Sequence, residues 1–533
     1  MRIWVVSREY AGIAEAGGVK NVSCSLSESL VKLGHEVIVF MPCYACTDFS
    51  RLETCTEDSD GGLDVNSDGR TFKICCRNGT LGGVKFVFFE NAIFGEKQAV
   101  YTYTKSEEKI NPCHCHGMGH ADSPLINSVF QKSVVAYWKK SGSAPDIIHC
   151  QDATAALVPT FMEDLCKRSP DAADFYRNTK CVVTIHNAGP GYHHDFASLD
   201  DAARFTGLPE DVLCSGLSAT GRTVEPFLLA SSTSCITTVS PEYAREIELG
   251  TTDTAGLSEG FRKRGVKILG ITNGIDVSRY SPQDKTCSLL PFEYNPEKKD
   301  FEGKLLCRKD FLEKYAGPEC ASSSIFDDIE QYGHLDREKG EEIYIAYHGR
   351  VVSQKGISVL AKAADILLGE KLPVRFIFIG QGQSDLEKEL MQLSLKHEGK
   401  SIYFRGYDRS LSRMCIAVSD FAVFPSFFEP CGLEDMIAQI FGTIPVAHAT
   451  GGLCKIIDDE TGFLYKNNTP EELAATLYSL VKIKYCAGGN IFNNMISFAA
   501  SYVRKNFSWL HVAENSYIPL YESLIGSGGK KQK

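Results

Sequence analysis

Short apolar runs alternate with stretches of helical spacing through the first half of the chain. Runs such as 146–150 and 181–185 end in polar residues, which is typical of buried parallel strands. Segments such as 23–33 and 127–139 place apolar residues three and four positions apart, as in a helix. Further strands are expected at 35–41, 84–90, 235–239 and 266–270. This pattern predicts a parallel sheet covered by helices, with functional groups at the carboxyl ends of the strands.

The same alternation returns in the second half, after a segment from Asp276 to about Glu342 where prolines interrupt it. Strands are then expected at 342–348, 375–380, 402–406 and 421–425, and helices at 353–369, 385–397 and 435–441. Tandem halves of this kind predict an α/β fold with two doubly wound, Rossmann-like domains.

Chain length agrees with two domains, because a single core rarely grows beyond about 250–300 residues and this chain has 533. We place the first domain at 1–275 and the second at 276–505. A loop-rich insertion is expected at about 317–342. Residues 526–533 are rich in glycine and lysine and are expected to form a disordered tail.

Composition excludes several classes of protein. The net charge of −11 argues against a general nucleic-acid binder, which needs a basic face. No apolar run approaches the roughly 18–20 residues of a membrane span. The apolar start at 3–6 is also too short for a signal peptide. We therefore expect a cytoplasmic protein whose 20 cysteines are mostly free thiols.

Cys113, His114, Cys115 and His116, with His120 nearby, could suggest a zinc site. Their alternating spacing does not match the usual pattern of two ligand pairs. We interpret the segment as a polar loop and expect no metal.

Two glycine-bearing turns carry the first functional signal. One holds Gly17 and Gly18 after the apolar run 3–6, and the other is the Thr-Gly-Gly-Leu of 450–453, which follows Glu-Pro-Cys-Gly-Leu at 429–433. Such turns let backbone N–H groups and a helix N-terminus approach a phosphate. A Gly-Gly pair alone is typical of an ordinary turn. Two of them, one in each half, predict nucleotide-binding domains that face a central cleft.

Arg350 and Lys355 stand five residues apart, after one expected strand and at the start of a helix. Two cations at a strand end can bind a diphosphate between them. The alternative is a solvated basic loop.

The Glu-Pro-Cys-Gly-Leu and Thr-Gly-Gly-Leu motifs, in this order, make the chain resemble the bacterial glycogen synthase and plant starch synthase family. The resemblance covers nearly the whole chain. It implies a retaining glycosyltransferase of GT-B-like architecture, with two Rossmann-like domains around a cleft. The implied reaction transfers glucose from ADP-glucose to the nonreducing 4-hydroxyl of an α-1,4-glucan. Neither a metal nor another cofactor is implied.

The resemblance also assigns roles to residues. His186, in Thr-Ile-His-Asn, would hold a sugar hydroxyl at the catalytic centre; Asp152 would hold the acceptor or donor sugar; Glu429 would support the charge that develops near C1. Cys431 matches the family motif, and we interpret it as part of the wall rather than as a nucleophile. Residues 506–525 resemble a terminal helix that crosses back to the first domain. The expected donor-binding residues are Gly17, Gly18, Arg350, Lys355, Asn273, Cys431, Gly432, Leu433, Thr450, Gly451 and Gly452.

Several positions depart from the family pattern. Glu15 replaces the lysine associated with the donor, and Glu434 and Asp435 replace a Thr-Gln pair. Ala153 and Ala449 replace a tryptophan and an arginine. These departures leave two alternatives open: a related glycosyltransferase with a different donor or acceptor, or a weakly active glucan-binding paralogue.

Overall fold

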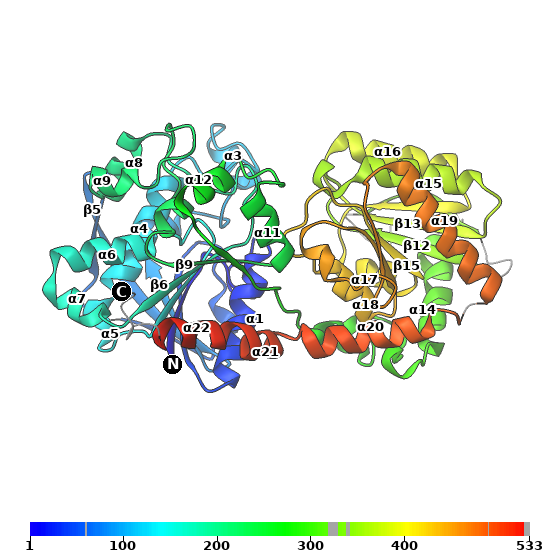
Figure 1. The fold of residues 1–533 in the computed structure, drawn as a ribbon, viewed down its shortest axis with the longest axis horizontal. Helices are drawn as coiled ribbons and strands as arrows, with labels where there is room; N and C mark the ends of the chain where they lie inside the picture. The colour runs from blue at the N-terminus through cyan, green and yellow to red at the C-terminus, as the bar shows by residue number, and fades with distance from the viewer. Residues whose placement is uncertain (59–60, 318–328, 337–341, 489, 527–533) are drawn as a thin grey trace. The chain divides into compact units, whose positions relative to one another are not determined.

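The computed structural model describes residues 1–58, 61–317, 329–336, 342–488 and 490–526. The chain forms two compact units, drawn in Figure 1. One contains Met1–Gly274 and the chain from Trp509 onward, and the other contains Ile275–Ser508.

The first unit is built on a ten-stranded mixed sheet with the order β10-β9-β8-β7-β1-β2-β6-β5-β3, in which β4 pairs with β5. The strands from β10 to β6 are parallel, whereas β3, β4 and β5 pair antiparallel. This antiparallel edge was not expected from the sequence. The strands are β1 Arg2–Val6, β2 Glu36–Pro42, β3 Thr54–Glu57, β4 Leu63–Ser67, β5 Arg70–Leu81, β6 Val84–Glu90, β7 Ile147–Gln151, β8 Lys180–Ile185, β9 Cys235–Thr238 and β10 Ile268–Gly270.

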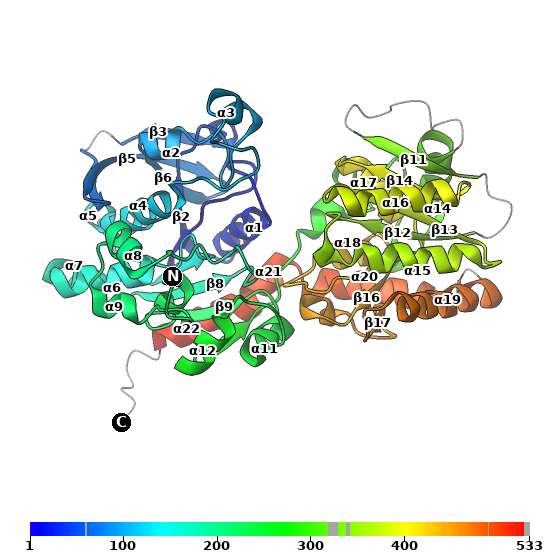
Figure 2. The same cartoon turned by 90° about the horizontal axis from the view of Figure 1, so that it is seen from above.

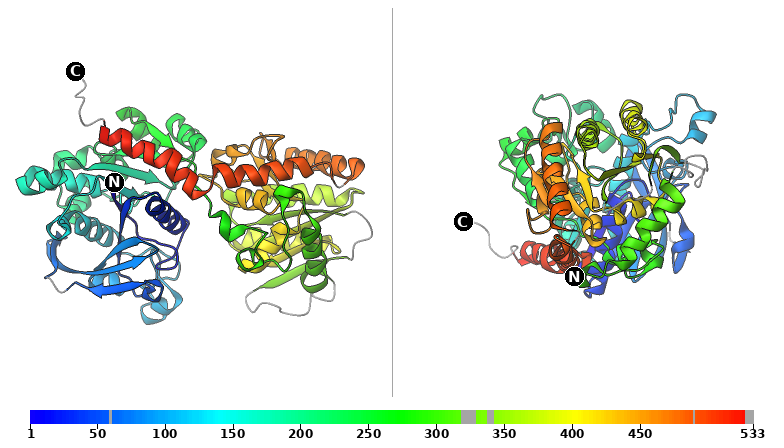
Figure 3. Two further views of the ribbon diagram at one scale, coloured as in Figure 1. Left: turned by 90° about the horizontal axis from the view of Figure 1, so that it is seen from below. Right: turned by 90° about the vertical axis from the view of Figure 1, so that its right-hand side faces the viewer.

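Helices cover this sheet, and the end of the chain returns to it. In the first unit, α21 and α22 lie along α1 and the sheet, as Figures 1 and 3 show in red. The Tyr521 hydroxyl lies 2.7 Å from Nδ1 of the buried His149 of β7. The helices are α1 Val19–Lys32, α2 Ala92–Gly95, α3 Lys105–Ile110, α4 Ser123–Ala136, α5 Trp138–Ser141, α6 Val158–Arg168, α7 Pro170–Tyr176, α8 Leu199–Thr206, α9 Glu210–Cys214, α10 Pro226–Ala230, α11 Pro241–Leu249, α12 Leu257–Arg264, α21 Trp509–Val512 and α22 Ile518–Gly526.

The second unit contains a seven-stranded sheet with the order β11-β14-β13-β12-β15-β16-β17 (Figure 2). Only β11, at one edge, is antiparallel among the described strands of this sheet. The strands are β11 Glu330–Leu335, β12 Ile343–His348, β13 Val374–Gly380, β14 Lys400–Arg405, β15 Phe421–Phe424, β16 Ile444–His448 and β17 Phe463–Tyr465. The helices are α13 Lys285–Ser288, α14 Glu302–Phe311, α15 Ile357–Gly369, α16 Ser384–Lys396, α17 Arg409–Ala417, α18 Glu434–Ile440, α19 Pro470–Ala487 and α20 Asn493–Asn506.

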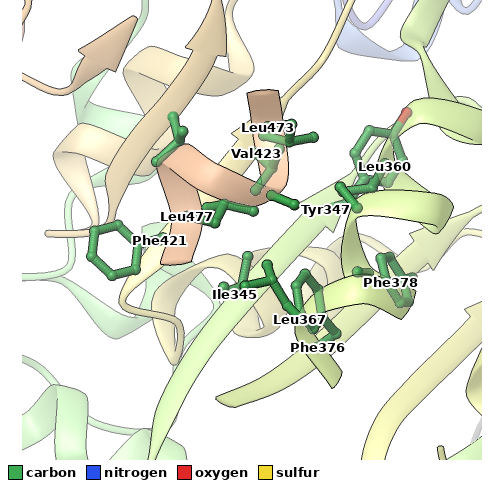
Figure 4. Packing of buried hydrophobic residues seen from close by; sticks show 14 of the residues in the cluster. Ile345, Tyr347, Leu360, Leu367, Phe376, Phe378, Phe421, Val423, Leu473 and Leu477 are labelled. Atoms are coloured by element: carbon green, nitrogen blue, oxygen red, sulfur yellow. The ribbon is translucent and has the colours of Figure 1, made fainter. Parts of the chain in front are cut away.

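Both faces of the second sheet are buried, which explains why its strands are apolar throughout. On one face, Ile345 and Tyr347 pack against α15 and α19, as Figure 4 shows. On the other face, the neighbouring Tyr344 and Ala346 pack against α14, α17 and α18. The predicted fold class, α/β with two doubly wound domains, is confirmed for the architecture of the two units.

The expected loop-rich insertion differs from the structure in its described part. Strand β11 lies within it and pairs with β14 from Glu330↔Arg405 to Leu335↔Lys400. The rest of the insertion, 318–328 and 337–341, lies outside the described residues, as does the expected tail from 527. Among the described residues, no helix has both the length and the apolar character needed to cross a membrane.

Candidate active site

The second unit has a pocket of about 450 Å³ at the carboxyl ends of its parallel strands. Ligand sites of open α/β sheets form at this edge. Arg350, Lys355, Glu429, Gly432 and Leu433, all expected from the sequence, line it. The other lining residues are Tyr347, His348, Gly349, Gly380, Gln381, Gly406, Tyr407, Phe424, Ser426, Glu434, Asp435 and Leu453.

Arg350 and Lys355 lie in the turn between β12 and α15. Lys355 Nζ donates to Oε2 of Glu429, and both side chains are mostly buried. Arg350 is exposed, so its guanidinium can meet an anion at the pocket. The turn approaches the Glu429 loop closely because residue 356 is glycine. Gly356 has a φ of +68°, and a Cβ there would lie 1.9 Å from the carbonyl oxygen of Pro425.

Glu429 follows β15 and is held by three hydrogen bonds. Besides the Lys355 contact, its Oε2 accepts a hydrogen bond from Ser426 Oγ at 3.1 Å. Its backbone oxygen accepts from Gly452 N at 2.7 Å. The carboxylate is therefore fixed beside a cation, where it can hold sugar hydroxyls or support positive charge.

Cys431 and the Thr-Gly-Gly turn pack beside the loop that carries Glu429. Cys431, Thr450, Gly451 and Gly452 are all buried, and none of them lines the pocket. Gly452 packs directly on the Glu429 loop, since a Cβ there would lie 1.9 Å from the Cys431 carbonyl oxygen. The sequence predicts contact between these residues and the donor. The structure shows Gly452 packed on the loop that carries Glu429, and the contact of these residues with the donor stays a prediction.

Glu434 and His348 form an ion pair within the pocket lining. The His348 Nδ1 atom lies 2.9 Å from Oε2 of Glu434. Burial lowers the pKa of His348, but the charge of Glu434 and this hydrogen bond outweigh burial and raise it. Burial raises the pKa of Glu434, and His348, Lys355 and Arg413 together lower it below its ordinary value. A carboxylate thus faces the region where a diphosphate would bind, with a histidine to neutralise it.

Two further residues of this unit were missed in the sequence analysis. Tyr407 follows β14, lines the pocket and is 59% exposed, so its ring can stack on a nucleotide base. Its position at a strand end is the signal that could have found it. Lys455 is buried behind the pocket and bonds to the motif loops. No motif pointed to it.

His186 and Asp152 lie in the first unit, at the carboxyl ends of β8 and β7. His186 Nε2 lies 2.8 Å from Oε1 of Gln151, and burial lowers the pKa of His186 to about 4, so its imidazole is neutral at pH 7. Burial raises the pKa of Asp152 and outweighs the hydrogen bonds from the N–H groups of His186 and Ala153, which lower it. The resulting pKa is about 7. Oδ1 of Asp152 is buried without a hydrogen-bond partner among the described residues. Such an atom suits a sugar hydroxyl.

A buried ion pair holds the loop that carries His186. His193 Nδ1 lies 2.8 Å from Oε2 of Glu225, and its Nε2 lies 2.7 Å from the Ala188 carbonyl oxygen. The Ala188 N–H donates to the Tyr243 hydroxyl at 2.8 Å. Burial lowers the pKa of His193, but Glu225 and the Ala188 carbonyl raise it to about 9. The protonated ring can therefore donate to both oxygens at neutral pH.

The turn with Gly17 and Gly18 already holds an internal carboxylate. Glu9 Oε2 accepts from the N–H groups of Ala16, at 3.0 Å, and of Gly17. Glu15 does not stand there as an isolated anion: its Oε2 accepts from Lys20 Nζ at 2.8 Å. The charge of Glu15 is therefore compensated by Lys20, at the start of α1.

The expected residues fall into two groups. The second unit contributes Arg350, Lys355, Glu429 and their supports, whereas Gly17, Gly18, Asp152, His186 and Asn273 belong to the first. Asn273 is buried, and its Oδ1 has no hydrogen-bond partner in the described chain. Within the described ranges, no group of three or more His, Cys, Asp or Glu side chains is arranged to hold a metal ion. In the segment 113–116, His114 stacks on Tyr103 with ring centroids 4.2 Å apart.

Comparisons with known proteins agree with this geometry. The starch synthase catalytic domain model matches residues 2–263, and the model for glycosyl transferases of group 1 matches 334–496. A glycogen synthase of Thermodesulfovibrio yellowstonii is 28% identical over 100% of this chain and 99% of its own. Glycogen synthase 2 of Geobacter sulfurreducens is 28% identical over 88% of this chain and 89% of its own.

Among solved structures, the catalytic domain of starch synthase IV from Arabidopsis thaliana, bound to ADP and acarbose, superposes with a TM-score of 0.78. It is 25% identical and covers 98% of this chain and 99% of its own. Sucrose-phosphate synthase of Thermosynechococcus elongatus, at 16% identity and a TM-score of 0.54, shares the fold.

Fold and site together define a glycosyltransferase with two Rossmann-like domains, of the GT-B class. Within this class, the chain belongs to the glycogen and starch synthase family and has a glycogen synthase-like function. The resemblance seen in the sequence is thereby confirmed. Membership implies a nucleotide sugar as donor and a glucan as acceptor.

Proposed function

We propose that this protein extends an α-1,4-glucan by transferring glucose from ADP-glucose with retention of configuration, in the cytoplasm. The observation that carries the proposal is the strand-end pocket of the second unit, where Arg350, Lys355 and Glu429 meet the exposed ring of Tyr407. Two cations, a carboxylate and a flat ring match the diphosphate, sugar and base of a nucleotide sugar. The Arabidopsis relative holds ADP and acarbose, which supports an adenine nucleotide and a glucan.

In the proposed reaction, the bond between C1 of glucose and the diphosphate oxygen breaks. A bond from C1 to the acceptor 4-oxygen forms on the same face, and the acceptor's proton passes to the leaving diphosphate. Arg350 and Lys355 stabilise the negative charge that grows on the diphosphate. Glu429, fixed by Lys355 and Ser426, supports the positive charge near C1.

The first unit would supply the groups that orient the sugars. Neutral His186 can donate one hydrogen bond and accept another, and Asp152 offers an unused oxygen. The cysteines of the described residues are all free thiols, which supports a reducing compartment.

A second candidate is a related glycosyltransferase with another donor. The observation that favours it is the pair of Glu434 and His348, since a carboxylate in the pocket changes which phosphate and ribose contacts are possible.

One assay separates the two candidates. Glucose incorporation into glycogen is measured from ADP-glucose and from UDP-glucose, side by side, with His186→Ala as the inactive control. Incorporation from ADP-glucose at a kcat/KM at least tenfold above that from UDP-glucose supports the proposal. The reverse ratio supports the second candidate, and no incorporation from either donor contradicts the proposal. The anomeric configuration of the new linkage, read by NMR, tests retention.

A further inference from the structure

Lys455 ties together the two motif segments beside the donor pocket. Its side chain is 6% exposed, and Nζ donates to the carbonyl oxygens of Cys431 at 2.8 Å, Gly432 at 2.8 Å and Gly452 at 2.9 Å. Nζ also lies 2.8 Å from Oδ1 of Asp435. An ammonium group has three hydrogens. With four oxygens around it, Lys455 has no hydrogen left for a ligand.

These contacts set the direction of the peptide groups in the loop. In a trans peptide, the C=O of one residue and the N–H of the next point in opposite directions. Because Lys455 holds the carbonyls of Cys431 and Gly432, the N–H groups of Gly432 and Leu433 point away from it. Gly432 and Leu433 both line the pocket. Backbone N–H groups directed into a pocket suit the oxygens of a phosphate.

Asp435 completes the arrangement. It is the second residue of α18, lines the pocket and is fully buried, with Oδ2 lacking a hydrogen-bond partner in the described residues. The charged groups that act on it are Lys455 and Glu429. Burial raises the pKa of Asp435, and Lys455 lowers it by less, so that the pKa is about 6. Lys455 thus compensates a carboxylate that would otherwise face the donor.

We propose that Lys455, paired with Asp435, is a positioning residue of the donor site, which holds the N–H groups of Gly432 and Leu433 toward the diphosphate. The proposal rests on the proposed function, because it assumes a nucleotide sugar in the pocket. Neither residue acts on the sugar itself. The expected consequence is a loss of donor affinity, with no change in acceptor affinity.

The test uses the full-length protein with Lys455→Met, Lys455→Met/Asp435→Asn and, as a matched control, the exposed Lys466→Met. ADP binding is measured by calorimetry, KM for each substrate by initial rates, and folding by circular dichroism and thermal unfolding. Lys455→Met leaves the buried carboxylate uncompensated, which lowers stability. The double variant removes this charge and should recover stability, while ADP binding stays about 30-fold weaker than in the wild type.

The outcomes separate this inference from the proposed function. Weak ADP binding and a raised donor KM in a stable double variant, with an unchanged acceptor KM, support it. A folded double variant that binds ADP within twofold of the wild type overturns it. Unfolding of both variants also overturns it, because Lys455 would then serve stability and not positioning. If the wild type itself binds no ADP, the proposed donor is wrong and the inference falls with it.

Discussion

Glu434→Gln offers a quantitative test of the donor pocket. Below the raised pKa of His348, the pair of His348 and Glu434 carries no net charge; above it, the pair carries one negative charge. The affinity of the wild type for ADP should therefore fall as pH rises through this pKa. The substitution removes the carboxylate and with it the cause of the raised pKa, so burial keeps His348 neutral. The affinity of the variant should then vary little with pH over the same range.

The size of the effect follows from the pocket. In a site of about 450 Å³, a bound charge lies roughly 7 Å from a charge in the wall, which at an effective dielectric constant of about 20 corresponds to roughly 2.4 kcal/mol. The Glu434 side chain is 37% exposed, so solvent screening reduces this to about 1–2 kcal/mol. Glu434→Gln should therefore tighten ADP binding about 5–30-fold above the raised pKa of His348.

Calorimetric titration of ADP into both proteins, in a series of pH steps upward from the ordinary pKa of histidine, measures the effect. The exposed Glu471→Gln serves as the control for the loss of one negative charge. The reasoning is refuted if Glu434→Gln binds ADP no more tightly than the wild type at any pH of this series. It is also refuted if the ratio of the two affinities does not change with pH.

Three further predictions concern other parts of the site. Lys355→Ala should cost about 2–4 kcal/mol of transition-state stabilisation, read from kcat/KM, in a variant that stays folded; an unchanged kcat/KM would exclude its role. Glu15→Lys should change the affinity for ADP less than about threefold at low or high salt, since Lys20 already compensates Glu15; a tenfold gain by calorimetry would contradict this. Glu225→Gln should lower the unfolding temperature at pH 7, because His193 is held protonated by Glu225 with its pKa at about 9. That stabilisation is present below the ordinary pKa of histidine and is lost as pH rises through about 9, so the difference should shrink at pH 10; a difference that does not vary with pH would argue against the pair.

The sequence indicated the positions of strands well, because buried parallel strands are continuous apolar runs. Residues 84–90 and β6 Val84–Glu90 coincide, and 375–380 differs from β13 Val374–Gly380 by one residue. It missed the antiparallel edge of β3, β4 and β5, where one face is exposed and the run is broken by polar residues. It also missed β11, which depends on pairing with a distant strand.

For the site, the strand-end motifs identified Arg350, Lys355 and Glu429 as pocket residues, since the carboxyl ends of parallel strands meet at one edge. The sequence could not show that Lys455 joins the segments of Cys431 and Gly452. Such roles depend on which backbone oxygens surround a side chain, and that is decided only when the loops pack.

By itself, the sequence determined the α/β class, the two tandem halves and the family, because periodicity and local motifs are properties of neighbouring residues. Tertiary structure alone decided the state of the charges. In the sequence, Glu15 is an acidic residue where the family has a lysine associated with the donor. In the structure, Lys20 neutralises it. Glu434 keeps its charge in the pocket beside His348, which stands 86 residues before it. The physical reason is that a charge is compensated by whatever lies within a few ångströms in space, and the order of residues along the chain does not specify that distance.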